Sequence, residues 1–493
     1  MLWVKNAVWW HVYPLGFVGA QIRGDEASGP VLHRFSHLEE WLDYALELGA
    51  SGIMLGPVFA SESHGYDTID YYRIDPRLGD LDDFDHFVLE AKSRGLRVCL
   101  DGVFNHVGKQ FEAYRKVVEG GPSAPEAEWF DLTWPDDWSP GVEPEYSRFE
   151  GHGPLVELNH DSDVVVEHVV DVMRFWLGRG VDGWRLDAAY AVAPEFWARV
   201  LPRVRQKHPK AWFVGEVIHG DYADIVARSS MDTVTQYELW KAIWSSVQDT
   251  NFHELAHALG RHSMFMETFV PQTFVGNHDV TRIVDAAGGP AEAVLAAAVL
   301  FTVPGIPSIY YGDEQGFTGV KTATESGDDA VRPPMPQTPD KLLPYGAAVH
   351  DAYRALVAMR RRHPWLVRAR LEIDEVTNAR IVYRVMPDKG KAAARAEGQV
   401  LTVTLDITRA AAPVAGPAEG SEPADGAEVA ERADAAEIAE AREPADAADV
   451  SEAAGNTEAL QHDESAEVPE SQPAKSAPTV LVVDVDGDVQ FRL

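Results

Sequence analysis

Short apolar runs alternate with amphipathic stretches along most of the sequence. The spacing predicts helices at 38–46, 82–94, 164–178, 194–207 and 292–301. The apolar runs predict eight strands, at 7–17, 52–59, 96–105, 181–187, 212–217, 233–237, 273–275 and 307–311. Repeated units of this kind form an α/β fold with a parallel sheet. The sheet is either open and doubly wound or closed into a (β/α)8 barrel.

Two parts of the chain depart from this alternation. The connection 107–161 is far longer than an ordinary loop and predicts a small subdomain inserted after the third strand. After the barrel, 370–385 and 399–407 read as antiparallel strands, and apolar runs return at 479–485 and 489–493. The segment between them is rich in Ala, Glu and Pro, which predicts a disordered acidic insertion. The predicted domains are a barrel at 1–106 and 162–365, the insertion at 107–161, and a C-terminal β domain at 366–493 interrupted at 409–478.

Net charge and targeting signals narrow the range of partners. The formal charge of −35 argues against nucleic acid and anionic membranes as partners, because phosphate contacts need surface cations. It favours an uncharged substrate.

Lys5 and Asn6 interrupt the N-terminal apolar stretch, so we expect a cytoplasmic protein without a signal peptide. The apolar window 294–307 is too short to span a bilayer. The single cysteine, Cys99, lies in an apolar run and reads as a buried small hydrophobe.

Polar residues gather at the C-terminal ends of four predicted strands. They are Asp101, Asn105, His106, Arg185, Asp187, Glu216, His278 and Asp279. One aspartate after a strand is more often a helix cap, but capping does not explain the whole set. Only a closed barrel brings these strand ends around one pocket, where barrel enzymes have their active sites. The sequence therefore predicts a barrel with a catalytic rim.

Two carboxylates at the ends of adjacent strands suit a retaining glycosidase. Strands lie about 4.8 Å apart, which lets Asp187 and Glu216 approach to the roughly 5 Å that the retaining mechanism needs. Arg185 leaves the same strand face as Asp187 and is predicted to keep that nucleophile ionised. Glu216 follows an apolar run with no cation beside it in the sequence, which suits a general acid.

A metal-dependent hydrolase is the competing chemistry for histidines at strand ends. Such sites need several imidazoles aimed at one point, and only His11 lies on the first strand. The pairs Asn105-His106 and Asn277-His278 fit hydrogen bonds to sugar hydroxyls better than metal ligation.

With these residues in place, the chain resembles the α-amylase superfamily, glycoside hydrolase family 13. The match covers nearly the whole barrel and the β domain. The motifs that carry it follow the family's order: GPVF (56–59), HGYD (64–67), DGVFNH (101–106), LVELN (155–159), GWRLDAA (183–189), GE (215–216), FVGNHD (274–279) and GIPSIYYGDE (305–314).

The resemblance implies a role for each site residue. Asp187 would form the covalent glycosyl-enzyme, Glu216 would act as acid and base, and Asp279 would bind ring hydroxyls as the third carboxylate. The remaining implied roles are ring contacts by His106 and His278, stacking by Tyr66, binding of the ring's far side by Asp67 and Arg332, and orientation of Arg185 by Asp101.

The departures from the family concern specificity and calcium. Ala188, Ala189, Tyr190 and Ala191 follow the nucleophile where liquefying amylases often carry Lys-His, which argues against endo-action on long polymers. His219, three residues after Glu216, resembles neopullulanase and cyclomaltodextrinase relatives, which implies substrate contact and action on oligosaccharides. Asn105 matches a calcium ligand of many amylases, with hydroxyl binding as the alternative, so a structural calcium stays open and no other cofactor is expected.

The expected function is retaining hydrolysis of α-glucosidic bonds, mainly α-1,4, in malto-oligosaccharides, starch or related α-glucans. Transglycosylation is the alternative enzyme activity, because a sugar hydroxyl in place of water would resolve the same intermediate. A non-catalytic carbohydrate-binding relative is the alternative outside enzymes, although such a protein would be expected to lose catalytic carboxylates and all three are present. Linkage preference and oligomeric state are not predicted.

Overall fold

The computed structural model describes residues 3–151, 153–324, 326–388, 396, 398–408 and 479–484. Eight parallel strands form one sheet whose spatial order follows the chain. The sheet closes between its end strands through a bridge from Thr235 to Gln272, so the predicted barrel is confirmed. Its strands are β1 (Trp9–Val12), β2 (Gly52–Leu55), β5 (Arg97–Gly102), β10 (Gly183–Leu186), β11 (Trp212–Gly215), β12 (Thr233–Val234), β13 (Gln272–Phe274) and β14 (Ile306–Tyr310).

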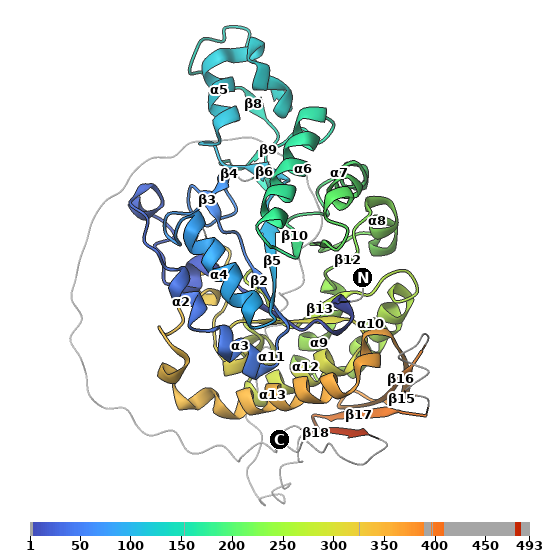
Figure 1. Ribbon diagram of the computed structural model, residues 1–493. Coiled ribbons are helices and arrows are strands. Elements are labelled where there is room, and N and C mark those ends of the chain that lie inside the picture. Colours follow the sequence, from blue (N-terminus) through green and yellow to red (C-terminus); the bar gives the residue numbers. More distant parts are fainter. Residues whose placement is uncertain are drawn as a thin grey trace, which may run out of the picture. The chain divides into compact units, whose positions relative to one another are not determined.

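Helices cover the outside of the barrel, and α6, α7 and α8 pack against one another in turn (Figure 1). Four of the five predicted helices are present, and α7 has the predicted bounds. The predicted helix 38–46 was wrong as a single element, because α2 and α3 lie there and are separated at Glu40 and Trp41. The helices are α2 (Phe35–Glu39), α3 (Leu42–Leu48), α4 (Leu81–Ser93), α6 (Asp163–Gly178), α7 (Pro194–Lys207), α8 (Tyr222–Ser229), α9 (Tyr237–Gln248), α10 (Phe252–Phe265), α11 (Ile283–Ala287), α12 (Pro290–Thr302) and α13 (Ala347–Arg362).

Several predicted strands were too long, among them 96–105 and 233–237, whose strands end at Gly102 and Val234. Three other runs contain a second element. The run 7–17 contains β1 and then the helical turn α1 (Pro14–Phe17), which begins at a proline as helices often do. The run 52–59 ends early because Pro57 lacks a backbone N–H, and Phe59 instead starts a hairpin of β3 (Phe59–Ser61) and β4 (Thr68–Ile74). The run 370–385 is a hairpin of β15 (Ala369–Val376) and β16 (Arg380–Pro387), because 377–379 forms a turn.

The interior at the N-terminal ends of the strands is filled by apolar side chains. Trp9 and Trp212 stack with ring centroids 5.3 Å apart, and Met54 and Ile306 pack around them. Cys99 belongs to the same cluster and is fully buried, as predicted. This packing leaves the C-terminal ends of the strands as the place for a site.

The connection after β5 carries its own small elements, which Figure 1 shows around α5 and β8. β6 and β9 pair at its base, and β7 pairs with β8. These elements are β6 (His106–Val107), α5 (Glu112–Gly120), β7 (Leu132–Thr133), β8 (Glu145–Tyr146) and β9 (Val156–Glu157).

An antiparallel sheet follows the barrel, in the order β15, β16, β17 (Leu401–Asp406) and β18 (Thr479–Asp484). It contacts α10 and α12, where the hydroxyls of Tyr383 and Thr302 lie 2.6 Å apart. β17 and β18 are neighbours, so the two strands that flank 409–478 pair directly. The predicted disordered insertion at 409–478 and the predicted strand at 489–493 lie outside the described residues. None of the described helices is long and apolar enough for a bilayer crossing.

Candidate active site

Strand register places the predicted carboxylates at one end of the barrel. Asp101 on β5 lies opposite Arg185 on β10. Leu186 on β10 lies opposite Gly215 on β11, so the residues that follow them, Asp187 and Glu216, leave adjacent strands at the same level. The sequence prediction that these strand ends share one pocket agrees with this geometry.

The guanidinium of Arg185 joins three buried carboxylates. Its Nη1 lies 2.6 Å from Asp101 Oδ2 and 3.1 Å from Asp187 Oδ1, and its Nη2 lies 2.5 Å from Glu216 Oε1. The Arg185 side chain is only 3% exposed, so this charge is not screened by bulk water. The contact with Asp101 fits the predicted role of that residue, which is to orient Arg185.

Glu216 accepts hydrogen bonds on both oxygens. The Tyr237 hydroxyl donates to Oε1 over 3.0 Å, and the backbone N–H of Ala188 donates to Oε2 over 3.1 Å. Together with Arg185, three donors therefore surround the carboxyl group. The prediction that Glu216 has no cation beside it was wrong, because Arg185 reaches it from the neighbouring strand.

Asp187 contacts Arg185 as predicted, but its ionisation differs from the prediction. Burial and the negative charge of Glu216 raise the pKa of Asp187 well above its usual value, and Arg185 offsets this only in part. Arg185 thus favours the ionised form of Asp187 as predicted, but burial and Glu216 outweigh it.

Asp279 lies beside two other polar groups at the end of β13. Its Oδ2 lies 2.8 Å from His278 Nε2, and its Oδ1 lies 2.7 Å from Arg332 Nη2. Burial alone would raise the pKa of Asp279, but His278 and Arg332 lower it well below its usual value. With its side chain 31% exposed, Asp279 presents a permanent negative charge to the pocket.

Tyr66 and two histidines line the same end of the barrel. The Tyr66 ring stacks on His278 with centroids 5.2 Å apart, and its hydroxyl contacts His278 Nε2 and donates to Asp101 Oδ2 over 3.1 Å. His106 Nε2 lies 3.0 Å from the Tyr66 carbonyl oxygen. The structure thus brings together Tyr66, His106 and His278 with the carboxylates.

Comparison with known proteins identifies the family. The family described as "Alpha amylase, catalytic domain" matches residues 35–342. The chain is 31% identical over 423 residues to "Neopullulanase 2" of Thermoactinomyces vulgaris, a match that covers 78% of this chain and 68% of that protein. The chain belongs to the alpha-amylase family.

Further comparisons agree with this family. A "Cyclomaltodextrinase" of Geobacillus thermopakistaniensis (strain MAS1) is 30% identical over 403 residues, which is 76% of this chain and 66% of that protein. A solved structure, the cyclic alpha-maltosyl-(1-->6)-maltose hydrolase from Arthrobacter globiformis, aligns with a TM-score of 0.70 at 25% identity and covers 82% of this chain and 91% of that chain. This alpha-amylase family chain spans about two thirds of the length of the curated relatives, 66% and 68% for the two named here.

Three further predicted substrate-binding residues of this alpha-amylase family protein, Asp67, Arg332 and His219, contact other protein groups. Asp67 is buried and accepts from Ser63 Oγ over 2.6 Å. Arg332 binds Asp279 and also Asp328 Oδ2, over 3.0 Å. His219 is exposed, with its ring 5.0 Å from the ring of Tyr190. Their contact with substrate stays a prediction.

Two asparagines contact protein groups. Sugar hydroxyls were the predicted partners of Asn277, and sugar hydroxyls or calcium were the predicted partners of Asn105. Asn105 Nδ2 lies 3.2 Å from His106 Nδ1, and Asn277 donates to the Tyr237 hydroxyl over 2.8 Å. Tyr237, which contacts Glu216, was missed as a site residue. The signal was present, because Tyr237 ends the predicted sixth strand, and that strand had contributed no residue to the predicted rim.

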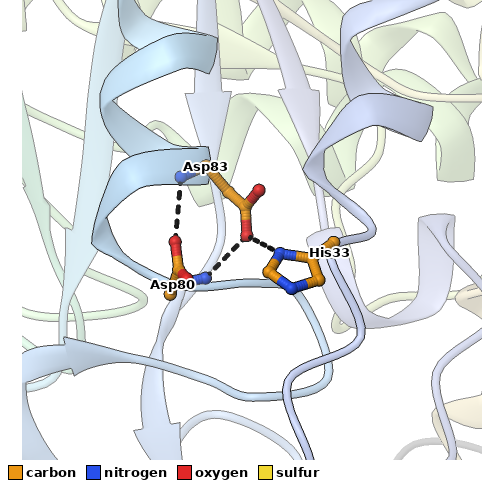
Figure 2. Close-up of side chains that lie close together, drawn as sticks. All are labelled: His33, Asp80 and Asp83. Atoms are coloured by element: carbon orange, nitrogen blue, oxygen red, sulfur yellow. Dashed lines mark hydrogen bonds and ion pairs between the residues drawn. The ribbon is translucent and has the colours of Figure 1, made fainter.

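One cluster in the described residues has the composition of a metal site, and Asn105 does not belong to it. Figure 2 shows His33, Asp80 and Asp83 at the start of α4. Asp80 Oδ1 accepts from the Asp83 N–H over 3.1 Å, and Asp83 Oδ2 accepts from the Asp80 N–H over 2.9 Å and lies 2.6 Å from His33 Nδ1. These contacts form a helix capping box, which explains the cluster without a metal.

Asp313 and Glu314 are a second pair of buried carboxyl groups and follow β14 in the motif GIPSIYYGDE. Burial raises the pKa of Glu314 from 4.5 to about 7, although Tyr44 donates to Glu314 Oε1 over 2.9 Å. A raised folded-state pKa means that the folded protein holds this proton more tightly, so stability is lost as the pH rises from 4.5 through 7.

We expect Glu314→Gln to remove that loss. Relative to the wild type, the variant should gain up to about 3 kcal/mol of unfolding free energy as the pH rises through this range. Denaturant unfolding at a series of pH values measures the difference. Glu145→Gln, at an exposed glutamate, is the control and should show no such trend. A difference that is the same at every pH would contradict the assignment.

Proposed function

We propose that this protein is a retaining glycoside hydrolase that cleaves α-glucosidic bonds, mainly α-1,4, in malto-oligosaccharides and related α-glucans. The observation that carries the proposal is the shared contact of Asp187 and Glu216 with the single guanidinium of Arg185. Two carboxyl groups held this closely suit a covalent mechanism better than an inverting one, which needs room for water between them.

In the proposed reaction, Asp187 attacks the anomeric carbon while Glu216 protonates the leaving oxygen. A covalent bond forms between Asp187 and the sugar as the glycosidic bond breaks. Glu216 then takes a proton from water, and the resulting hydroxide oxygen displaces Asp187 to release the sugar with its α configuration retained. The charge of Asp279, kept by His278 and Arg332, suits binding of ring hydroxyls.

The names of the relatives suggest the substrates to test. They include a cyclomaltodextrinase, a neopullulanase and a hydrolase of a cyclic maltosyl-maltose. We therefore propose that short and cyclic malto-oligosaccharides are cleaved faster than starch, in agreement with the absence of a Lys-His pair after Asp187.

The test is product analysis by chromatography on maltoheptaose, cyclodextrin, pullulan, starch and sucrose, with Asp187→Asn as the control. Short malto-oligomers with initial α configuration by NMR, lost in the control, are the expected result. Products longer than the substrate would instead indicate a transglycosylase. No turnover of any of these sugars would overturn the proposal.

We also propose that activity needs no calcium. The Asn105 amide nitrogen lies beside His106, and the described residues bring no group of carboxylates to that position. Dialysis against EDTA is expected to leave kcat/KM on maltoheptaose and the melting temperature unchanged. A fall in either value that added Ca²⁺ restores would show a calcium site at Asn105 or elsewhere.

A cytoplasmic location is proposed as well. The one cysteine of the sequence, Cys99, is buried, so no disulfide within the chain supports the fold. This is typical of proteins in reducing compartments. Cell fractionation with an antibody to the protein tests it, and recovery from the culture medium or the envelope would contradict it.

A further inference from the structure

A series of hydrogen bonds connects Glu216, at the end of β11, to residues that follow β12 and β13. The backbone N–H of Asp279 donates to Asn277 Oδ1 over 2.8 Å, Asn277 Nδ2 donates to the Tyr237 hydroxyl over 2.8 Å, and that hydroxyl donates to Glu216 Oε1 over 3.0 Å. The three side chains are at most 7% exposed, so water does not compete for these bonds.

The backbone N–H of Asp279 determines the direction of all three hydrogen bonds. A backbone N–H can only donate, so the oxygen of the Asn277 amide must face Asp279 and its NH₂ must face Tyr237. The Tyr237 oxygen then accepts one hydrogen and sends its own to Glu216. Burial and the charge of Glu216 raise the pKa of Tyr237 well above its usual value, so the hydroxyl keeps its proton.

Glu216 Oε1 consequently has two donors, the Tyr237 hydroxyl and Arg185 Nη2. Both lone pairs of this oxygen are used. Among the described residues, Oε2 accepts only the Ala188 N–H, so it has a lone pair left for a proton. A protonated Glu216 must therefore carry its hydrogen on Oε2.

We propose that Tyr237 and Asn277 are positioning residues that place the acid proton of Glu216 on Oε2 and stabilise its carboxylate form. This inference rests on the proposed function, in which Glu216 is the acid and base. The charged and titratable groups around Glu216 come from several elements and include His11, Asp101, Arg185, Asp187, Tyr190 and Tyr237. All except Tyr237 are unchanged in the variants below.

The first test needs no enzymatic activity. Tyr237→Phe removes a donor from the Glu216 carboxylate, so the charged form of Glu216 is less stabilised in the folded variant. The variant should therefore lose stability relative to the wild type as the pH rises. Thermal unfolding across a pH series should show this growing loss. In a Glu216→Gln background, the pH dependence of the Tyr237→Phe effect should disappear, and the same pH dependence in both backgrounds would overturn the proposal.

Two further variants sharpen this test. Asn277→Leu removes the amide that donates to the Tyr237 oxygen and adds no titratable group, so it should show the same growing loss with pH, in a smaller amount, even if Tyr237→Phe folds poorly. Tyr383→Phe removes a buried hydroxyl whose partner among the described residues is Thr302. Its effect on the melting temperature should not change with pH. An Asn277→Leu effect as flat as that of Tyr383→Phe would count against the proposal.

The second test reads the acid step directly. Tyr237→Phe should lower kcat/KM on maltotriose about 10-fold and move the alkaline limb of its pH profile up by about one pH unit. On α-maltosyl fluoride the loss should stay within about 2-fold, because fluoride leaves without a proton from Glu216. If kcat/KM fell equally on both substrates and the alkaline limb of the pH profile did not move, the role of Tyr237 would be merely structural. If the wild type cleaves no sugar, the proposed function fails, and the unfolding series still decides on Tyr237 and Asn277.

Discussion

Replacement of Asp187 by asparagine is expected to lower kcat/KM on maltoheptaose by on the order of 10⁴-fold or more, because an amide oxygen is too weak a nucleophile to form the glycosyl-enzyme. The fold should survive the change. The raised pKa of Asp187 shows that its ionised form costs stability in the folded state, so the melting temperature at neutral pH should be equal or higher. Initial rates and thermal unfolding measure the two effects.

Chemical rescue separates a nucleophile from a residue that only binds. Asp187→Gly with azide and α-maltosyl fluoride should yield β-maltosyl azide, because azide attacks from the face that Asp187 leaves empty. Asp249→Asn, at an exposed aspartate after α9, is the matched control and should keep wild-type activity. An Asp187→Asn variant within about 10-fold of the wild type would be incompatible with covalent catalysis by this residue.

The second large effect concerns stability. Arg185→Met leaves Asp101, Asp187 and Glu216 buried without their shared cation, and loss of one partner from a buried ion cluster costs about 3–5 kcal/mol. The carboxyl groups would then ionise only at higher pH, so the loss should be smallest in acid and deepen as the pH rises. Denaturant unfolding at several pH values measures it.

A surface arginine supplies the comparison. Arg199 pairs with Asp163, and both side chains are largely accessible, at 37% and 95% exposed. Arg199→Met should therefore change the unfolding free energy by about 1 kcal/mol at most, with little dependence on pH. If Arg185→Met were as mild as Arg199→Met, the three carboxylates would not depend on the guanidinium as described.

The sequence predicted the barrel and the rim residues because both depend on local patterns. Parallel strands buried on both faces give apolar runs, and polar residues that end such runs must gather at one end of a closed barrel. Asp101, Asp187 and Glu216 could be placed by this rule alone. The ends of the strands were less predictable. The run 52–59 looked apolar throughout, but β2 ends before Pro57, which lacks a backbone N–H.

Contacts between strands could not be predicted from spacing along one strand. The sequence pairs Arg185 with Asp187, two residues away, but the distance to Glu216 depends on how β10 and β11 align. The ionisation of Asp187 depends on burial and on Glu216, neither of which is local. The same holds for Tyr237, whose hydroxyl reaches Glu216 from the next strand end and is held there by Asn277.

The covalent intermediate on Asp187 is the central claim, and trapping it is the most direct measurement. The wild-type protein would be incubated with a 5-fluoro-α-glycosyl fluoride, which forms the intermediate readily and releases it slowly, then digested and analysed by mass spectrometry. The account predicts one added glycosyl group on the peptide that contains Asp187. Label on any other residue, or complete turnover to a product of inverted configuration with no label, would contradict it.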